Sequence, residues 1–539
     1  MKHAWIALAA LILLPACSRV NAASAETRAN AWTTPHVLTI SDGGDADTLN
    51  PHLTQFATTA NLSELTMAWL IRWDAHNVPY PELATEVPTQ ANGGVSRDGL
   101  TITYHLRKGV TWSDGAPFDA DDVAFSTAAV NNPANDEGVR FDMISKVDEP
   151  DKYTIVYHLK KPMSTSVEAF FSSCCANPCL LPKHLLAKYP NINHVPYNDL
   201  PVGIGPFVFQ RWDRHKQIVL VANQRYWRGR PRLDKIVYEI VPDRTALLGR
   251  LQAHRVDMWY QFGGAYLPKI QTLSGYRIYR QPSYAYDHYD FNITHPVVAE
   301  LTVRQALRLG LDRRGLVQSV AHGVGVVQDS ATPVNAPYFV DLGATPYDPV
   351  EANAMLDRAG WRRGSDGIRS KNGVRLVLDM AVSGQASTLD KTIDFVRNDW
   401  QKIGVGLNVR HYPQPKFFAP AQQGGIAYGN SWDVETFAWA ADPMGDYSGQ
   451  YGCKALPPAG FNALHWCDRA ADAAMNALNS HYEQAQRTAD VRTAMEAFVR
   501  DVPSIVSDLR VDLFAYNADL KNYHPNNITP FDNMMDVDI

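Results

Sequence analysis

The stretch DGLTITYHLRKGVTWSDGAPFDADDVAFS, residues 98–126, predicts a strand, a turn and a helix in succession. Apolar and polar residues alternate in its first half, as is typical of a half-exposed strand. Residues 113–115 (Ser-Asp-Gly) have turn-forming chemistry, and Asp119 is placed to cap the helix that follows. We therefore expect a corner between strand and helix, with Trp112 packed against it.

The middle of the chain has the pattern of an α/β domain. Residues 348–360 predict a helix that is capped by Asp348 and ends at Gly360. A predicted strand over 374–382, a helix over 388–404 and a strand over 405–412 follow with short connections. Strand, helix and strand in this order predict a parallel pair of strands with a right-handed crossover.

Length and composition indicate an ordinary globular protein of two or three domains. The chain has 539 residues, of which 45% are hydrophobic, and its mean hydropathy is −0.26. A net charge of −6 gives no basic surface for nucleic acid or anionic lipid. The 13 Trp and 24 Tyr residues suit a binding cleft, although most aromatic side chains belong to a core.

The N-terminus has the pattern of an export signal. Lys2 and His3 precede an apolar run over 5–16, which is too short to span a bilayer. The sequence LLPACS ends this run and resembles the lipobox of bacterial lipoproteins, which implies cleavage before Cys17 and its acylation. The alternative is a plain secretory signal that is cut near Ala22. No later stretch is apolar enough to cross a membrane.

The other cysteines would then lie in an oxidising compartment, where disulfide pairing is the default. Cys453 and Cys467 flank a loop rich in Pro and Gly and are predicted to close a short ring. Cys179 is expected to pair with Cys174 or Cys175, which leaves one thiol over. A metal cluster is the rival interpretation, but the cysteines lack the spacing and the paired histidines that zinc favours.

Five segments resemble, in the same order, the extracellular solute-binding proteins of family 5, which serve ABC importers of di- and oligopeptides. The opening stretch resembles the family's signature segment. The others are PVGIGPFVFQRWDRHKQIVLVANQRYW at 201–227, YDFNITHPVVAELTVRQALRLGLDRRGLV at 289–317, YDPVEANAMLDRAGW at 347–361 and WDVETFAWAAD at 432–442. The resemblance extends from about Val37 to NITPFD at 527–532.

This resemblance implies an α/β fold of the periplasmic-binding-protein type II, a Venus-flytrap of two lobes with an extra domain inserted in the first lobe. The implied segments are a signal at 1–17, a linker at 18–35, a discontinuous first lobe at 36–75, 204–286 and 504–539, an inserted domain at 76–203, and a second α/β lobe at 287–503. The lobes would close around a ligand through crossing segments near 284–292 and again near Pro503.

The resemblance also implies where the ligand lies. Asp442 follows the predicted strand at 432–440 and stands three residues after Trp439, the relation in which the family's aspartate pairs with a peptide's α-ammonium. Ligands of open α/β sheets bind beyond the carboxyl ends of strands. Asp446 is the second candidate for this role, because the loop here is shorter than is common in the family. Asp442 could otherwise only open a turn with Pro443.

Three further residues are candidate ligand-binding residues by position. Tyr284 and Tyr286 precede the crossing strand and are expected to form cleft walls, and Thr54 lies in a loop that could reach the cleft. No cofactor or metal is expected, since the 17 histidines lack metal-ligand spacing.

The sequence therefore predicts a monomeric, lipid-anchored extracytoplasmic receptor that captures peptides and delivers them to an ABC permease and its ATPase. Motifs for serine hydrolases, zinc proteases and nucleotide binding are lacking, so no enzyme activity is expected. Two alternatives are a receptor of the same family for nickel, haem or another non-peptide ligand, and a lipid-anchored peptide hydrolase.

Overall fold

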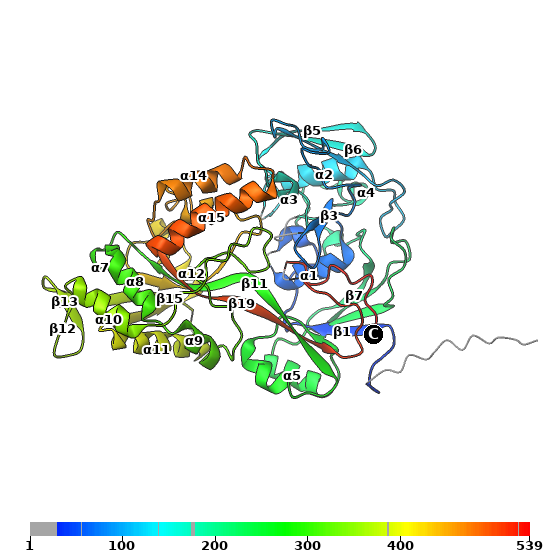
Figure 1. Ribbon diagram of the computed structural model, residues 1–539. Coiled ribbons are helices and arrows are strands. Elements are labelled where there is room, and N and C mark those ends of the chain that lie inside the picture. Colours follow the sequence, from blue (N-terminus) through cyan, green and yellow to red (C-terminus); the bar gives the residue numbers. More distant parts are fainter. Residues whose placement is uncertain (1–29, 55, 138, 174–177, 385–386, 527) are drawn as a thin grey trace, which may run out of the picture.

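A single large β-sheet runs through both lobes of the molecule (Figure 1). The computed structural model describes residues 30–539 except 55, 138, 174–177, 385–386 and 527. The sheet has 11 strands in the order β16-β15-β17-β11-β19-β10-β1-β9-β8-β7, and β18 pairs with β11 outside this path. The fold is mixed α/β with two lobes, as predicted.

Two long strands connect the lobes. β11 (Tyr276–Phe291) and β19 (Ser504–Asn517) pair antiparallel, from Tyr276 opposite Asn517 to Asp290 opposite Ser504. At one end β19 pairs with β10 (Met258–Trp259) of the first lobe, and at the other end β11 pairs with β17 (Val434–Thr436) of the second lobe. The register of the pair shifts between Pro282 and Tyr286. The chain thus passes between the lobes as a two-stranded ribbon.

The second lobe contains the predicted crossover unit. β15 (Val377–Ser383), α11 (Ser387–Lys402) and β16 (Gly406–Tyr412) follow one another, and the two strands pair in parallel. α10 (Pro349–Arg358) begins after Asp348, whose carboxylate accepts hydrogen bonds from the amides of Val350 and Glu351. The lobe also contains α7 (Pro296–Ala299), α8 (Leu301–Leu309), α9 (Arg313–Ser319), α12 (Gln414–Phe417), α13 (Ser448–Tyr451), α14 (Arg469–Leu478), α15 (Gln484–Asp501), β18 (Ala438–Ala440) and a small sheet of β12 (Arg362–Arg363), β13 (Arg369–Lys371) and β14 (Val374–Arg375).

The first lobe surrounds the other end of the large sheet. Its strands are β1 (Val37–Ser41), β7 (Phe207–Asp213), β8 (Gln217–Ala222), β9 (Lys235–Glu239) and β10. Its helices are α1 (Ala57–Thr66), α5 (Arg244–Gln252) and α6 (Leu267–Ile270). Buried side chains of β1, β8 and β9 form one core with the C-terminal residues Phe531 to Ile539.

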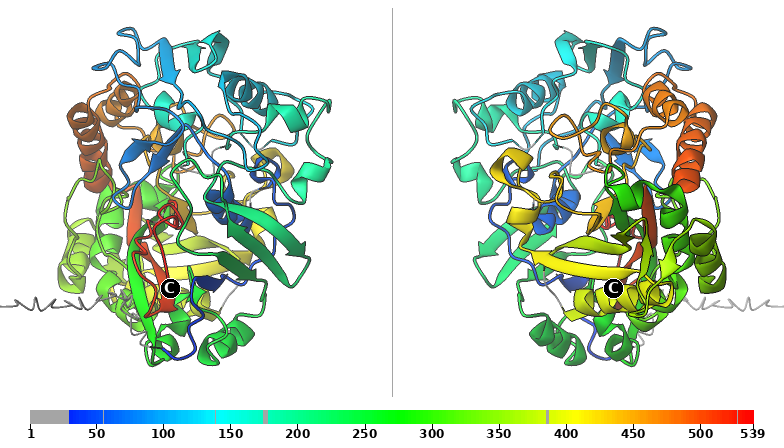
Figure 2. Two further views of the ribbon diagram at one scale, coloured as in Figure 1. Left: turned by 90° about the vertical axis from the view of Figure 1, so that its right-hand side faces the viewer. Right: turned by 90° about the vertical axis from the view of Figure 1, so that its left-hand side faces the viewer.

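A separate three-stranded sheet lies above the large sheet, at the opposite end from α5 (Figures 1 and 2). It consists of β4 (Thr101–His105), β5 (Ile144–Asp151) and β6 (Thr154–Leu159). The predicted corner is present: Asp119 caps α2 (Ala120–Val130), and Trp112, which is 1% exposed, donates a hydrogen bond to Asp122. This region also contains β2 (Ile71–Trp73), β3 (Pro79–Pro81), α3 (Ser166–Ala169) and α4 (Lys183–Leu186). The residue bounds given above for the signal, the linker, the two lobes and the inserted domain stay predictions.

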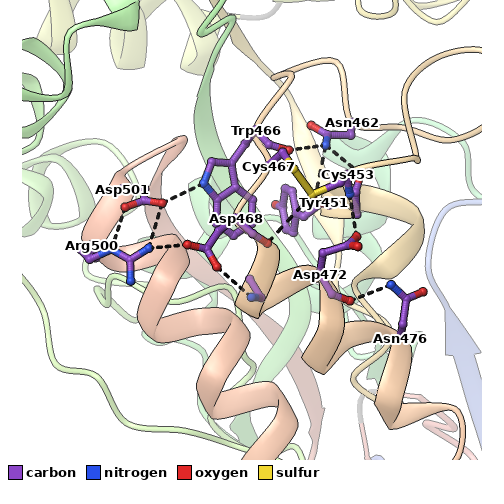
Figure 3. Close-up of a disulfide and its surroundings, with 12 residues drawn as sticks. Tyr451, Cys453, Asn462, Trp466, Cys467, Asp468, Asp472, Asn476, Arg500 and Asp501 are labelled. Carbon is purple, nitrogen blue, oxygen red and sulfur yellow. Dashed lines mark hydrogen bonds and ion pairs between the residues drawn. A yellow bond between two sulfur atoms is a disulfide. The ribbon is translucent and has the colours of Figure 1, made fainter.

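The cysteines give one result that matches expectation and one that does not. Cys453 and Cys467 form a disulfide beside α14 (Figure 3). Cys179, however, is a free thiol, and its expected pairing with Cys174 or Cys175 is wrong. Its side chain is fully buried against Met67 and Trp69, and its carbonyl lies 2.9 Å from Nε2 of the buried His52. Cys17, Cys174 and Cys175 lie outside the described residues.

Candidate functional site

The strand that precedes Asp442 has an unpaired edge. β17 pairs with β15 on one side and with β11 on the other. β15 ends at Ser383, and β18, which continues the line of β17, pairs only with β11 among the described strands. The outer edge of β18 therefore lacks a strand partner, although the carbonyl of Ala440 on this edge accepts a hydrogen bond from Nε2 of Gln450 at 3.4 Å. An extended peptide can add a strand to such an edge.

Asp442 lies directly after this edge. The amide of Ala441 donates a hydrogen bond of 2.8 Å to the carbonyl of Tyr284, which fixes the end of the strand. One carboxyl oxygen of Asp442 accepts hydrogen bonds from the amides of Met444 and Asp446, at 2.7 and 3.2 Å. Asp442 thus does open a turn, as the alternative interpretation held. Its second carboxyl oxygen has no hydrogen-bond partner within the described chain and stays available for a ligand.

Burial raises the pKa of the Asp442 carboxyl to about 6, and the charge of Asp446 adds to this effect. The backbone hydrogen bonds to Asp442 lower its pKa and partly offset the burial. The carboxyl is therefore mostly ionised at neutral pH and becomes protonated in mild acid. An ionised carboxylate that is partly buried is well suited to pair with an ammonium group.

Tyr284 lies next to Asp442, and its expected place in a cleft wall stays a prediction. Its side chain is 6% exposed, and its buried hydroxyl has no hydrogen-bond partner within the described residues. Burial raises the pKa of this hydroxyl, and the charge of Asp442 raises it further. Tyr338, which the sequence did not single out, donates a hydrogen bond from its hydroxyl to the carbonyl of Asp442. The two tyrosines pack around the aspartate.

Trp439 and Tyr286 are paired across the ladder of β18 and β11. Trp439 is half-buried, and its ring centroid lies 5.1 Å from that of Phe437 and 5.7 Å from that of Phe461. Tyr286 is fully buried, and its hydroxyl lies 2.7 Å from the hydroxyl of Tyr451. In this conformation Tyr286 belongs to the core of the second lobe, whereas Trp439 keeps an accessible face.

The remaining two candidates differ from Asp442 in their surroundings. Both carboxyl oxygens of Asp446 are engaged, one by the amide of Ser448 at 2.8 Å and the other by Nδ2 of Asn479 at 3.2 Å. Thr54 lies in the first lobe, where its hydroxyl donates a hydrogen bond to Asp47. The structure thus places Asp446 beside Asp442 in a structural role, while Thr54 is separate from both.

A cavity of about 680 Å³ lies between the lobes, against the crossing ribbon. Its lining includes residues 261–265 of the first lobe, the ends of β15 and β17, and residues of α9 and α11 in the second lobe. The six residues predicted to bind ligand are absent from this lining, which is confined to described residues. The cavity adjoins the unpaired edge of β18, because Phe437 and Ala438 contribute to its wall.

The polar floor of the cavity could have been read from the sequence. Asp508, Arg510 and Asp512 of β19 all line the cavity together with Asp287 of β11. Charged residues at alternate positions of a strand share one face of the sheet. The segment SDLRVDL at 507–513 has this alternation, so a polar face on the second crossing strand was predictable.

Comparison with known proteins identifies the family. Residues 78–455 match the model of "Bacterial extracellular solute-binding proteins, family 5 Middle". This chain belongs to that family. The family consists of solute-binding receptors, which agrees with the expectation that the protein is not an enzyme. Within the described part of the chain, no group of His, Cys, Asp and Glu could hold a metal ion, and no helix is both long and apolar enough to cross a membrane.

Curated relatives and solved structures extend this likeness over most of the chain. The family 5 protein is 27% identical to the oligopeptide-binding protein AppA of Bacillus subtilis over 322 residues, which span 58% of each chain. It is 24% identical to di/tripeptide-binding protein 1 of Pseudomonas aeruginosa over 477 residues, 81% of this chain and 82% of the relative. The structure of AppA from Bacillus subtilis with a nonapeptide has a TM-score of 0.70 and 20% identity, and the match covers 94% of this chain and 99% of that one. This last likeness shows the fold.

Proposed function

We propose that this family 5 protein is the receptor of an ABC importer that captures peptides with a free N-terminus and delivers them to a membrane permease and its ATPase. One observation carries the proposal: the unpaired edge of β18 leads directly to the carboxylate of Asp442. The edge supplies backbone hydrogen bonds to any peptide, whatever its sequence. Asp442 supplies a charge partner at the point where the peptide's chain would begin.

The contacts of the two carboxylates support the assignment of the ammonium to Asp442 rather than to Asp446. Asp442 has a free carboxyl oxygen, whereas both carboxyl oxygens of Asp446 are held by Ser448 and Asn479. A charge-assisted hydrogen bond from an ammonium would satisfy the free oxygen and contribute about 1.5–3 kcal/mol. Names of relatives that bind oligopeptides or di- and tripeptides support the same class of ligand.

The proposal includes the location of the protein outside the cytoplasm and its anchoring by an acylated Cys17. Peptide delivery requires that the receptor stays close to the permease, and a lipid anchor would keep it at the membrane. One acyl chain gives only weak binding, so stable anchoring requires more than one chain on or near this residue. We propose a monomeric receptor, in which the two lobes of one chain enclose one ligand.

The test is mass spectrometry of small molecules that co-purify with the exported protein, followed by calorimetry with a library of dipeptides to pentapeptides. We expect peptides to be released on denaturation and to rebind without being cleaved. Recovery of a nickel chelate, haem or another non-peptide compound, with no affinity for any peptide, would refute the peptide assignment. Cleavage products after incubation would instead indicate the hydrolase.

A further inference from the structure

The cavity against the crossing ribbon divides into an apolar wall and a charged floor. The wall is formed by side chains from both lobes, namely Phe262, Leu316, Val317, Val320, Leu389 and Phe418. The floor is formed by the charged residues of β11 and β19. We propose that this cavity binds the lysine or arginine side chain of a captured peptide. The inference rests on the proposed function, because it places the peptide along β18.

The floor of the cavity has more negatively charged than positively charged side chains. Asp287, Asp508 and Asp512 face a single guanidinium, that of Arg510. Arg510 is already engaged in two contacts with Asp287, of 2.7 and 3.0 Å. Arg313 lies beyond the floor and is bound to Asp329 at 2.5 Å. Asp508 and Asp512 therefore form no direct ion pair with a described residue, although the charge of Arg510 lies near both.

Asp508 is the member of this group that is best placed for a ligand. It lies opposite Asp287 in the ladder of β11 and β19, lines the cavity, and is only 8% exposed. The hydroxyl of Ser507, next to it in sequence, is its hydrogen-bonding neighbour. A carboxyl group that is removed from water and faces another carboxyl group is stabilised by an arriving cation.

The raised pKa values of the aspartates in the floor favour a cationic ligand. Burial, reinforced by the charge of Asp287, raises the pKa of Asp508 to about 7, although Ser507, Arg510 and Arg313 lower it. Burial likewise raises the pKa of Asp512 to about 6. Near neutral pH Asp508 is thus partly protonated when the cavity is empty. A bound cation would favour the ionised form, so binding would release protons.

Lysine and arginine match both parts of the cavity. Their side chains combine an apolar stem with a cationic end, and they bury the stem along apolar surfaces. The apolar wall suits the stem, and the carboxyl groups suit the end. An acidic side chain would meet like charges, and a purely apolar one would leave Asp508 and Asp512 without an ion-pair partner.

The position of the cavity is consistent with a peptide whose N-terminus is at Asp442. Ala438 lies four residues before Asp442 in the protein, which corresponds to about 13 Å along an extended strand. A peptide that runs antiparallel to β18 from Asp442 would therefore pass Ala438. Phe437 and Ala438 already belong to the wall of the cavity. A side chain a few residues from the peptide's N-terminus would therefore reach the floor.

The inference can be tested by calorimetry with pentapeptides of alanine that carry one lysine at position 2, 3, 4 or 5. Each has a matched partner with norleucine, which keeps the apolar stem but lacks the ammonium. We expect one position at which lysine binds about tenfold or more tightly than norleucine. Titrations near pH 7 in buffers of different ionisation enthalpy should show that the lysine peptide releases protons on binding.

Asp508→Asn should reduce the preference for lysine to about twofold or less, remove the proton release and preserve the affinity for pentaalanine. Asp512→Asn should weaken the preference in part, and it replaces the first variant if that one does not fold. Asp394→Asn on the exposed side of α11 changes the net charge equally and should keep the preference intact.

Equal affinities of lysine and norleucine peptides, or a preference that survives in Asp508→Asn, would overturn the inference. If pentaalanine binds and lysine brings no gain, only the side-chain site fails and the proposed function stands. If no peptide binds at all, both are refuted.

Discussion

Asp290 of β11 and Glu435 of β17 lie directly opposite each other in the sheet, and both side chains are buried. Neither oxygen of the Asp290 carboxyl accepts a hydrogen bond from a described residue, and the same is true of Oε2 of Glu435. Nδ1 of the buried His288 lies 2.9 Å from Oδ1 of Asp290. Burial raises the pKa of Glu435 well above its usual range, and the charge of Asp290 raises it further.

This pair makes stability depend on pH. The pKa of Glu435 is higher in the folded than in the unfolded protein, so the folded state holds a proton that the unfolded state loses above about pH 4.5. The free energy of unfolding therefore falls as the pH rises above that value. We expect Glu435→Gln, which cannot ionise, to remain folded and to be more stable than the parent at pH 8 by about 1 kcal/mol or more, with a smaller difference at pH 5. Urea unfolding at both pH values measures this.

The control for this prediction is Glu496→Gln, which removes an exposed carboxylate on α15. Its effect should be small and similar at pH 5 and pH 8. A Glu435→Gln variant that loses as much stability as the parent between these two pH values would show that Glu435 is ionised in the folded protein.

Asp442→Asn should weaken binding of peptides with a free N-terminus by about 10- to 100-fold, because the buried ammonium loses its carboxylate. N-acetylated peptides should bind the parent protein poorly and should be affected little by the substitution. Since burial raises the pKa of Asp442 to about 6, the affinity for free peptides should fall as the pH is lowered through 6. Calorimetry between pH 5 and pH 8 gives all three results.

Asp446→Asn is the matched variant for this experiment. Its carboxylate is held by Ser448 and Asn479, so the change should lower the melting temperature more than the affinity. Equal affinity of the parent protein for free and acetylated peptides would remove Asp442 from the role. A larger loss of affinity in Asp446→Asn than in Asp442→Asn would transfer the role to Asp446.

The disulfide between Cys453 and Cys467 should stabilise the second lobe. It closes a loop with a sequence separation of 14. Beside it the amide of Cys453 donates a hydrogen bond to the carboxylate of Asp472, and Nδ2 of Asn462 donates one to the carbonyl of Gly452 (Figure 3). By the chain-entropy model a ring of this size contributes about 3 kcal/mol to the free energy of unfolding. Replacement of both cysteines by serine should cause a loss of this order in denaturant unfolding. Non-reducing peptide mapping should recover the linked pair, and free thiols at both positions in the exported protein would contradict it.

Acylation of Cys17 predicts that the protein fractionates with membranes. Globomycin, which blocks lipoprotein signal cleavage, should then leave a larger precursor in the membrane fraction. Cys17→Ser should prevent both processing at this site and anchoring. If this variant is processed and located like the parent protein, a plain signal cut near Ala22 is the correct interpretation.

Local sequence patterns predicted the elements whose causes are themselves local. Asp119 and Asp348 cap the helices that they were expected to cap, and the strand, helix and strand between 374 and 412 form the expected parallel unit. The capping residues and the hydrophobic spacing act within a few residues, so they can be read without tertiary contacts. The family resemblance provided the two-lobe arrangement that no local pattern contains.

The site was predicted less completely because it depends on pairings between distant segments. Alternation shows that β11 has two faces, but it does not tell which face meets the core, and Tyr286 was therefore expected in the cleft wall although it is fully buried here. The cavity arises where β19 lies beside β11, more than 200 residues apart in the chain. The spacing of the cysteines likewise did not show that Cys179 is a free thiol whose side chain packs against Met67 and Trp69.

The break in register on the crossing ribbon has a mechanical consequence. Pro282 pairs with Val511 and Tyr286 with Leu509, so β11 contains two more residues than β19 across this interval. Extra residues in one strand disrupt the ladder locally and bend that strand. Tyr284 lies within the interval, and its carbonyl holds the amide of Ala441, next to Asp442. The interrupted part of the ribbon is thus linked by a backbone hydrogen bond to the residue before Asp442, and we expect occupancy of the proposed site to alter the flexibility of the ribbon at this point.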